Sequence, residues 1–326
     1  MYNGKNISSP NSICVVNNIH GLFLYFLLCP DEFDNTLFVF SEDIPYEVSS
    51  RIKNKIVFPS FNGHSRKVAL LLKVFYYWYF KIRKFKSITK GIVKYYGHDH
   101  LYFSGMFVNN NFILLEDGTA NYLTPSEKKE SKLKKILKKM LIGDIGGKYG
   151  FNNCVKKVIL TGLMPVPKQL KIKSSIICMK SHWENLSSEQ INKLLYLFNE
   201  HSFPKFKKVV IFTQPFSEDN LISEHDKREI YSFIIDYYLQ IFNLEDICIK
   251  PHPREITNYA TLYGCDLVNT KLPAQILLFN SPPEVAATVY SSAVYQQMSC
   301  RVDIFGTQPF PVLAKKVGII PGNIEY

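Results

Sequence analysis

The sequence predicts an α/β protein with two domains, each built on a parallel sheet. Short β-branched runs alternate with helical patterns along the chain, which indicates βαβ units with helices covering a parallel sheet. The chain has 326 residues, of which 46% are hydrophobic, enough for two substantial cores. A proline-bearing, lysine-rich connector ends near Ser175. We place the boundary there, which gives domains of residues 1–175 and 176–326.

The first domain opens as strand, loop and helix. Ser12 to Val16 is a β-branched run, and an apolar helical stretch follows at Leu22 to Leu28. Further strands are expected at residues 36–40, 55–58, 91–95, 112–115 and 157–161, with a helix at 68–86. The helical patterns between these runs predict a parallel sheet.

A capping box predicts a basic helix before the last strand of this domain. In Thr124-Pro125-Ser126-Glu127, a capping hydroxyl precedes a glutamate by three residues, and proline holds the first helical position. Apolar residues then recur at helical spacing, while the lysines from Lys128 to Lys139 cover the remaining surface. This Lys128–Lys139 helix is either a solvated charged face or an anchor on an anionic membrane surface or lipid-linked acceptor.

The second domain continues the alternation. Ser187 to Gln190 is another capping box and opens a helix that runs to Phe198. Strands are expected at residues 208–212 and 246–250, on either side of a long amphipathic helix at 223–242. Shorter elements are expected at residues 274–279, 285–290, 294–298 and 302–305.

The charge of the chain favours anionic partners. The formal net charge is +11 and the sequence pI is about 9.1, which fits nucleic acid, an anionic membrane or a phosphate-bearing substrate. No nucleic-acid recognition motif is present, so we expect no nucleic-acid partner. Seven cysteines without a CxxC pair indicate neither disulfides nor a thiolate zinc site, and fit a reducing cytoplasm. The polar segment from Met1 to Pro10 predicts no secretory signal.

The most hydrophobic run, Val68 to Phe80, is too short to span a bilayer. It is either a buried helix, which we favour because it is apolar on nearly every face, or an interfacial segment with aromatic side chains among lipid headgroups. His98-Asp99-His100 lacks a third ligand at suitable spacing, so we expect an ordinary polar loop and no metal site.

Three short motifs each follow an apolar run: Glu116-Asp117-Gly118, Lys250-Pro251-His252-Pro253-Arg254 and Tyr290-Ser291-Ser292. Ligands of open α/β sheets bind beyond the carboxyl ends of strands, so these motifs are expected to face one cleft. Their chemistries are complementary. A carboxylate accepts a proton from a hydroxyl, an imidazolium neutralises a departing phosphate, and serines at a helix start bind phosphate oxygens.

The order of these strings, LLEDGTANY, IKPHPRE and VYSSA, resembles the motifs of bacterial sialyltransferases of glycosyltransferase family 52. That family includes lipooligosaccharide sialyltransferases, and the polysialyltransferases are related to it. Phe212-Thr213-Gln214-Pro215, followed by Ser217-Glu218, also looks like this family. The resemblance spans most of the chain, from the first strand to Ser292.

The resemblance implies a GT-B fold, in which two Rossmann-like domains with parallel sheets face a central cleft and the C-terminal domain binds the cytidine nucleotide. It implies inverting, metal-independent transfer of N-acetylneuraminic acid from CMP-N-acetylneuraminic acid to a galactoside of a surface glycan, lipooligosaccharide or capsule, with no cofactor. Asp117 would be the general base, and Glu116 would orient or replace it. His252 would be the general acid or phosphate stabiliser. The residues expected to bind the donor are Lys250, Pro253, Ser291, Ser292 and Gln214.

Several alternatives stay open at this point. The base is Asp117, which we rank first, or a carboxylate of the long helix such as Asp226 or Glu229, contributed across a homodimer. Asp226 also reads as the capping-box acid of Ser223. The donor is CMP-sialic acid or another nucleotide sugar, as in a glucosyltransferase. The remaining alternative is a non-catalytic basic protein of the membrane surface. We expect a cytoplasmic protein, peripherally associated with the inner face of the cytoplasmic membrane.

Overall fold

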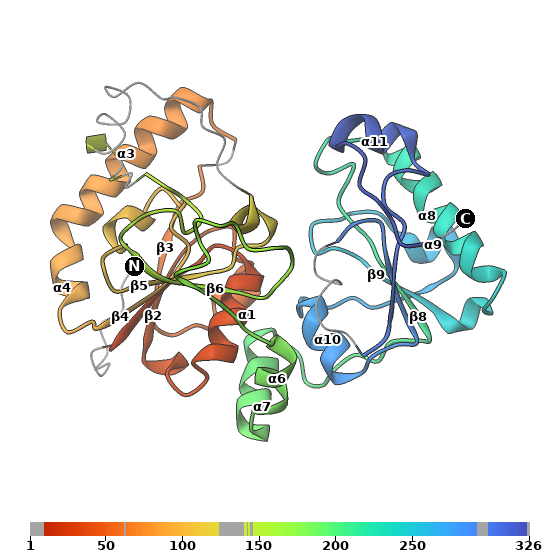
Figure 1. The fold of residues 1–326 in the computed structure, drawn as a ribbon, viewed down its shortest axis with the longest axis horizontal. Coiled ribbons are helices and arrows are strands. Elements are labelled where there is room, and N and C mark those ends of the chain that lie inside the picture. Colours follow the sequence, from red (N-terminus) through yellow and green to blue (C-terminus); the bar gives the residue numbers. More distant parts are fainter. Residues whose placement is uncertain are drawn as a thin grey trace. The chain divides into compact units, whose positions relative to one another are not determined.

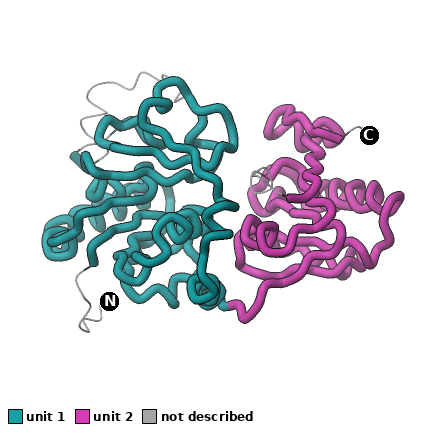
Figure 2. Tube along the Cα trace, turned by 60° about the horizontal axis from the view of Figure 1, so that its bottom comes forward, with its two compact units in different colours: residues 1–199 teal, residues 200–326 magenta. Residues whose placement is uncertain are grey.

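The computed structural model describes residues 10–61, 63–123, 140–141, 143, 146–291 and 299–324. The chain forms two compact units, Met1–Asn199 and Glu200–Tyr326 (Figure 2). The boundary expected after Ser175 is therefore too early. Strand β7 (Ser174–Ile176) pairs with β6 (Val155–Leu160), and helix α6 (Met179–Glu184) packs against α1 (Ile19–Leu28), so this part of the chain belongs to unit 1.

Unit 1 contains a sheet in the order β3-β2-β1-β4-β5-β6-β7, and each neighbouring pair is parallel, as the sequence predicts (Figure 1). The apolar runs are the strands because a sheet covered on both faces buries consecutive side chains. The remaining strands are β1 (Ser12–Val15), β2 (Thr36–Ser41), β3 (Lys55–Phe58), β4 (Lys94–Gly97) and β5 (Phe112–Leu115).

Helices cover both faces of this sheet. On one face, Tyr25 of α1 contacts the rings of Phe38 and Tyr96, with ring centroids 5.5 and 5.2 Å apart. On the other, Tyr77 and Phe80 of α3 join the core formed by alternate residues of β1 and β2. The other helices of unit 1 are α2 (Tyr46–Ser49), α3 (Arg66–Arg83), α4 (Phe85–Thr89) and α7 (Ser188–Leu197).

Unit 2 contains a second parallel sheet, in the order β10-β9-β8-β11-β12 (Figure 1). Helix α8 (Glu224–Leu239) packs its apolar stripe against β8, β9 and β11. The strands are β8 (Val209–Phe212), β9 (Ile247–Lys250), β10 (Asp266–Leu267), β11 (Val285–Thr288) and β12 (Arg301–Ile304), and the other helices are α9 (Tyr259–Tyr263), α10 (Ala274–Asn280) and α11 (Pro311–Val317).

Both sheets reverse their strand order once. In unit 1 the chain starts at β1, adds β2 and β3 on one side, and then crosses to β4 on the other. Unit 2 repeats this plan with β8, β9 and β10 on one side and β11 on the other. Such a reversal leaves a crevice at the carboxyl ends of the two strands that flank it. The switch points therefore lie at the ends of β1 and β4 and of β8 and β11.

The structure corrects one helix prediction and leaves others outside its range. The helix expected at residues 68–86 is present as α3 and α4, but the favoured burial of the run Val68 to Phe80 is wrong, because in α3 only Tyr77 and Phe80 are buried. The Lys128–Lys139 helix, the 294–298 element and Ser292 lie outside the described residues. In the part of the chain that is described, no helix combines the length and hydropathy of a membrane span.

Candidate active site

The loops that follow β1, β4 and β5 meet at the switch point of unit 1. Asn18 follows β1 and caps α1, where its Oδ1 accepts the N–H of Gly21 at 2.7 Å. His98 and His100 follow β4, and Glu116 and Asp117 follow β5. Since these strands are parallel, their carboxyl ends lie on one edge, and their polar side chains converge there.

Asp117 lies at the centre of this group. Its Oδ1 accepts a hydrogen bond from Asn18 Nδ2 and lies 3.5 Å from His98 Nδ1, whereas its Oδ2 lies 3.5 Å from His100 Nε2. Its backbone N–H donates to Asn121 Oδ1 at 2.7 Å. The next residue, Gly118, has φ +125°, which a side chain would strain. The carboxylate is held in place but remains 18% exposed.

The pKa values at this switch point move in opposite directions. Burial raises the pKa of Asp117, and the nearby His100, His20 and Asn18 oppose this only in part. Burial lowers the pKa of His100, which keeps that imidazole neutral at physiological pH. A carboxylate whose pKa is raised is a better base than a free one. Asp117 thus combines accessibility with raised basicity.

The neighbouring carboxylate, Glu116, is fully buried and fully hydrogen-bonded. It accepts bonds from Tyr122 Oη at 2.5 Å and from the N–H and Oγ1 of Thr161, each at 2.6 Å. Burial acts to raise its pKa, but the nearby His20 imidazole and the bonds from Thr161 and Tyr122 outweigh burial, so the pKa is lowered. Glu116 is therefore placed to brace the ends of β5 and β6, and its geometry does not favour a role as replacement base.

His98-Asp99-His100, which the sequence predicts to be an ordinary polar loop, contributes both histidines to the group around Asp117. Asp99 accepts the N–H groups of Tyr149 and Gly150 at 2.7 and 2.8 Å. The Tyr149 ring then stacks on His100, with centroids 4.7 Å apart. Asp99 thus orients the tyrosine that packs on the histidine beside Asp117. Among the described residues, no three His, Cys, Asp or Glu side chains group as metal ligands.

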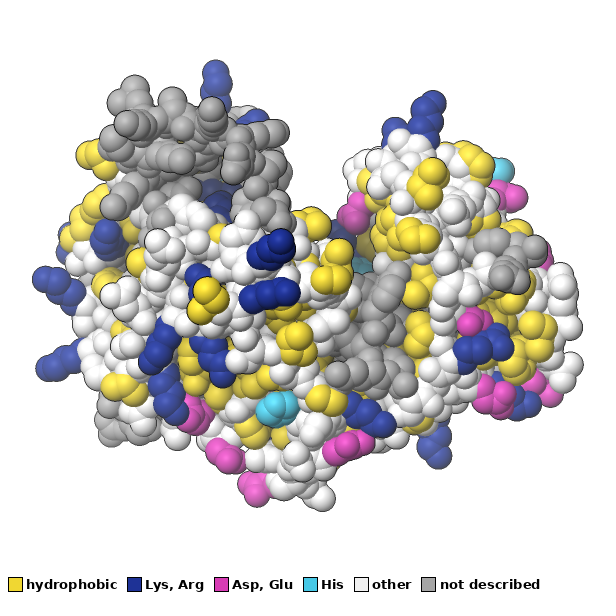
Figure 3. All heavy atoms as spheres, in the orientation of Figure 1, with side chains coloured by type: hydrophobic (Ala, Val, Ile, Leu, Met, Phe, Trp, Pro, Cys, Tyr) yellow, Lys and Arg dark blue, Asp and Glu magenta, His cyan; other side chains and the backbone are white. Residues whose placement is uncertain are grey.

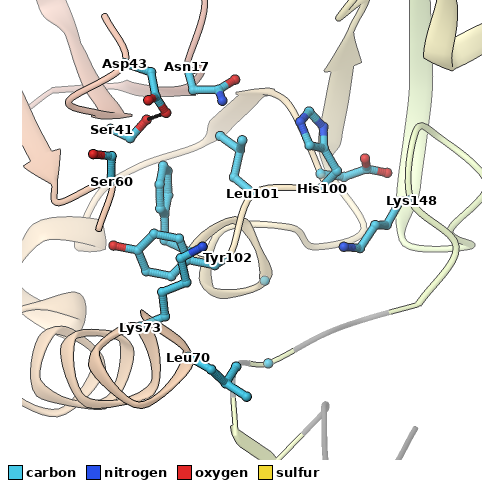
Figure 4. Close-up of a pocket in the computed structure, with 14 residues that line it drawn as sticks. Asn17, Ser41, Asp43, Ser60, Leu70, Lys73, His100, Leu101, Tyr102 and Lys148 are labelled. Atoms are coloured by element: carbon cyan, nitrogen blue, oxygen red, sulfur yellow. Dashed lines mark hydrogen bonds between the residues drawn. The ribbon is translucent and has the colours of Figure 1, made fainter. Parts of the chain in front are cut away.

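A pocket of about 420 Å³ opens beside this site (Figure 4). His100 belongs to both its wall and the Asp117 group. In the close-up, Lys73 and Lys148 extend toward its middle, and Asp43, held by Ser41 Oγ at 2.6 Å, lies on its far side. The other lining residues are Asn17, Ser60, Leu70, Asp99, Leu101, Tyr102, Phe103, Gly105 and Gly143. Hydroxyl, carboxylate and ammonium groups around an aromatic wall suit a sugar.

In unit 2, His252 follows β9 in a loop that Glu255 closes. The His252 N–H donates to Glu255 Oε2 at 2.7 Å, and His252 Nδ1 accepts the N–H of Arg254 at 3.2 Å. Because Nδ1 accepts, the neutral ring carries its proton on Nε2. Burial, with Arg254 and Lys250 nearby, lowers the pKa of His252 to about 4. In the free protein this histidine is therefore a neutral hydrogen-bond donor.

Glu255 is itself anchored by a buried charge network. It accepts bonds from Thr213 Oγ1 and from Tyr259 Oη, and its Oε1 lies 3.7 Å from Lys227 Nζ. Lys227 is completely buried and also contacts Glu218 and Glu224 at 3.0 Å. The network ties the His252 loop to the end of β8 and the start of α8.

The two cations of the His252 motif have partners of their own. Lys250 Nζ donates to the carbonyl oxygens of Pro251 and Thr270, each at 3.0 Å. Arg254 forms a bidentate pair with Asp219, at 2.7 and 3.2 Å. Lys250 therefore supports the loop, and its geometry does not favour the expected role as a donor ligand. Pro253 is exposed beside His252.

The switch point of unit 2 brings together the ends of β8 and β11. Gln214 Oε1 accepts the N–H of Tyr290 at 3.0 Å, which joins the two strand ends. The N–H of Ser291 donates to Thr288 Oγ1 at 3.1 Å. Gln214, Ser291 and the His252 loop thus gather on the carboxyl edge of one sheet, as the sequence predicts. The alternative base Asp226 forms the capping box of Ser223, whose Oγ lies 2.5 Å from its Oδ2.

Comparison with known proteins identifies the family. The profile of glycosyltransferase family 52 matches residues 46–308, which include Asp117, His252 and Ser291. The chain belongs to glycosyltransferase family 52. It is a glycosyltransferase, which implies a nucleotide-sugar donor and a glycan acceptor. An uncharacterized protein of Haemophilus influenzae is 31% identical over 335 residues, which cover 96% of this chain and 99% of that protein.

Solved structures resemble this chain at low sequence identity. A sialyltransferase from Photobacterium damsela is 12% identical, with a TM-score of 0.50 over 90% of this chain and 73% of that chain. A UDP-GlcNAc 2-epimerase from Neisseria meningitidis, bound to UDP-GlcNAc, is 8% identical, with a TM-score of 0.46 over 90% and 82%. The two parallel-sheet units thus form a GT-B fold, as the family resemblance implied.

Proposed function

We propose that this family 52 enzyme is an inverting sialyltransferase, which transfers N-acetylneuraminic acid from CMP-N-acetylneuraminic acid to a galactoside terminus of a bacterial surface glycan, lipooligosaccharide or capsule. The observation on which this rests is Asp117, an accessible carboxylate of raised pKa beside a sugar-sized pocket. The Photobacterium damsela sialyltransferase has the same fold, and the motifs around Asp117, His252 and Ser291 supply the chemistry this donor needs.

In the proposed reaction, Asp117 accepts the proton of the acceptor hydroxyl. Its Oδ2 is the less engaged oxygen, because Oδ1 accepts the hydrogen bond from Asn18, whereas Oδ2 lies 3.5 Å from His100 Nε2. The hydroxyl oxygen attacks the anomeric carbon, and the bond from that carbon to the phosphate oxygen breaks. The electron pair leaves with CMP. The acceptor sugar occupies the pocket beside His100, so its hydroxyl approaches Asp117.

His252 stabilises the leaving phosphate. Its proton is on Nε2, so the neutral ring donates a hydrogen bond to a phosphate oxygen, and the phosphate charge raises its pKa toward that of a proton donor. Ser291 and Ser292 are proposed to bind the same phosphate, with Gln214 fixing the strand ends around it. We propose that the reaction requires no metal or other cofactor. The roles of Asp117 and His252 are the same whether the enzyme is a monomer or a homodimer. The enzyme would act in the cytoplasm, at the inner face of the membrane.

The test is transfer of labelled sialic acid from CMP-N-acetylneuraminic acid to a soluble galactoside such as lactose. We expect turnover that chelators do not abolish. No transfer to any sialyl acceptor, together with transfer from another nucleotide sugar, would overturn the proposal. Thermal unfolding with CMP and with UDP separates the donors quickly. A nucleotide present at 100 times its Kd stabilises the folded protein by about 2.7 kcal/mol.

A further inference from the structure

We propose that α3 and α4 form a docking surface for an anionic lipid bilayer and hold the acceptor pocket at that bilayer. The docking surface consists of residues 66–90. The inference deepens the proposed function, and rests on it only in making the acceptor a glycolipid. The binding of lipid itself is argued from the two helices alone.

Helix α3 has two apolar stripes, of which the sheet covers one. Tyr77 and Phe80 are buried in the core of unit 1. A second stripe recurs every three or four residues along the same helix, so its members share one face. All of them are exposed: Val68 by 44%, Leu71 by 70%, Phe75 by 63%, Tyr79 by 50% and Ile82 by 73%. Single exposed apolar residues are common, but a whole stripe marks an interaction surface.

The charges of this segment have one sign. Residues 66–90 contain eight Lys and Arg and no Asp or Glu. Lys81 Nζ lies over the Trp78 ring at 4.8 Å, which keeps a cation beside an aromatic side chain. Figure 3 shows hydrophobic side chains interspersed with Lys and Arg on the side of unit 1 where α3 and α4 lie. The basic residues are Arg66, Lys67, Lys73, Lys81, Arg83, Lys84, Lys86 and Lys90.

An anionic bilayer satisfies both features at once. Its acyl region accepts the aliphatic stripe, its headgroup region suits Tyr and Trp rings, and its surface charge attracts Lys and Arg. A second copy of the chain would place like charges against each other. Nucleic acid would satisfy the cations but leave Leu71 and Ile82 in contact with water or phosphate. The stripe runs from Val68 to Ile82, so at 1.5 Å per residue it extends about 21 Å along the surface.

The same helix also lines the acceptor pocket. Leu70 and Lys73 of α3 are pocket residues, and Leu71 and Phe75 lie beside them on the exposed stripe. A bilayer bound to the stripe therefore lies one helix away from the pocket. A sugar attached to a lipid in that bilayer would reach the pocket while its lipid stays in the membrane.

Vesicle flotation tests the proposal. We expect the full-length protein to float with vesicles of phosphatidylcholine and phosphatidylglycerol, and not with phosphatidylcholine alone. The variant Leu71→Gln/Phe75→Gln/Ile82→Gln should reduce partitioning about a hundredfold, since three side chains no longer enter the bilayer. The variant Lys67→Gln/Arg83→Gln/Lys86→Gln should reduce it by a similar factor, at about fivefold per charge. Glutamine retains helix propensity at each position.

The matched control is Ile172→Gln/Ile241→Gln/Ile319→Gln, which removes three exposed isoleucines elsewhere on the surface. It should float like the wild type. Equal flotation of the stripe variant would overturn the proposal. So would a stripe variant that floats normally but unfolds more easily, because another part of the chain would then cover the stripe. Two further outcomes would overturn the proposal. In the first, the wild type is a dimer that does not bind vesicles, and the stripe variant is a monomer. In the second, the wild type is retained on DNA and does not bind vesicles.

The docking surface and the proposed function can be tested separately. With a soluble galactoside, the stripe variant should turn over at the wild-type rate, whereas with a glycolipid in vesicles its rate should fall at least tenfold. If the wild type fails on the soluble galactoside while flotation behaves as described, the proposed function fails and the docking surface stands. If the stripe variant and the charge variant both transfer to glycolipid in vesicles at the wild-type rate, the docking surface has no role in the use of the acceptor, and that part of the proposal fails.

Discussion

The two switch points have the same topology and different chemistry. In unit 1, the end of the sheet holds neutral histidines and a partly exposed carboxylate whose pKa burial raises. In unit 2, it presents an Nε2–H donor, hydroxyls and backbone groups, while the carboxylates nearby are occupied with Lys227. The first arrangement suits removal of a proton, and the second suits binding of an anion. One strand order thus supplies two half-sites whose roles depend on the loops.

The comparison predicts its largest effect at Asp117. Asp117→Asn should lower kcat by about 10²–10⁴-fold, the usual contribution of a positioned base, with little change in the affinity for CMP. Steady-state rates and calorimetric titration with CMP measure the two quantities. Asp226→Asn is the control and should retain activity within a few-fold, since Asp226 serves its capping box. The reverse result would assign the base to α8.

In unit 2 the largest effect should concern stability. Lys227→Met leaves Glu218, Glu224 and Glu255 without their shared counter-ion, and breaking a buried ion pair in this way costs about 3–5 kcal/mol. Urea unfolding measures the free energy. Lys208→Met is the control, because Lys208 pairs with Asp246 at the surface and its loss should cost less than about 1 kcal/mol. If both variants lose the same free energy of unfolding, burial does not determine how much the Lys227 ion pairs stabilise the protein.

His252→Ala should distinguish the two half-sites by their effect on nucleotide binding. It removes a hydrogen bond to a charged phosphate, which corresponds to about 10–100-fold weaker CMP binding. Asp117→Asn, on the other half-site, is the comparison and should bind CMP like the wild type. Calorimetry of both variants measures this difference. Loss of CMP affinity in Asp117→Asn, with none in His252→Ala, would contradict the assignment of donor and acceptor sides.

The smallest effects should distinguish two adjacent carboxylates in unit 1. Glu116 has a lowered pKa, so its ionised form stabilises the protein above an unfolded pKa of about 4.3, and this stability is lost as the pH falls through the lowered folded value. Glu116→Gln should therefore cost about 1–3 kcal/mol at pH 7, less as the pH falls.

Asp117 has the opposite shift. Its folded pKa is raised, so its charge costs stability as the pH rises from the unfolded pKa of about 3.9 through the folded value, and Asp117→Asn should stabilise the protein at pH 7 while lowering kcat. Urea unfolding at pH 7 measures both variants. If Asp117→Asn is instead less stable than the wild type, the contacts of the Asp117 carboxylate stabilise the folded protein by more than its burial costs. The rate of the wild type should also fall with decreasing pH, because Asp117 must be ionised to act as the base, and its pKa is raised by burial.

Much of the fold could be predicted from the sequence because its signals are local. Buried parallel strands read as β-branched runs, and the capping boxes of Ser187 and Ser223 are confirmed. Helix α6 and strand β7 were missed because they are short and depend on packing, which also displaced the domain boundary. The favoured burial of the apolar run in α3 is wrong because composition alone does not show that the sheet covers only one stripe of the helix.

The sequence predicts where the residues of the candidate site lie better than it predicts which side chains contact one another. A motif at a strand end located Asp117 and His252. The contact of His100 with Asp117 joins loops after β4 and β5, and it follows only once the strand order is known. The sequence also could not separate the roles of Glu116 and Asp117. That difference arises because Thr161 and Tyr122 enclose one carboxylate and leave the other accessible.

The hydrogen bond between Gln214 and the backbone of Tyr290 sets the separation of the ends of β8 and β11. Phe212 and Thr288 are the last paired residues of β8 and β11, and two residues further the side chain of Gln214 takes the place of a backbone acceptor. The separation of the two strand ends thus depends on the length of one side chain. A change from glutamine to asparagine could alter the width of the nucleotide crevice while every strand stays in register.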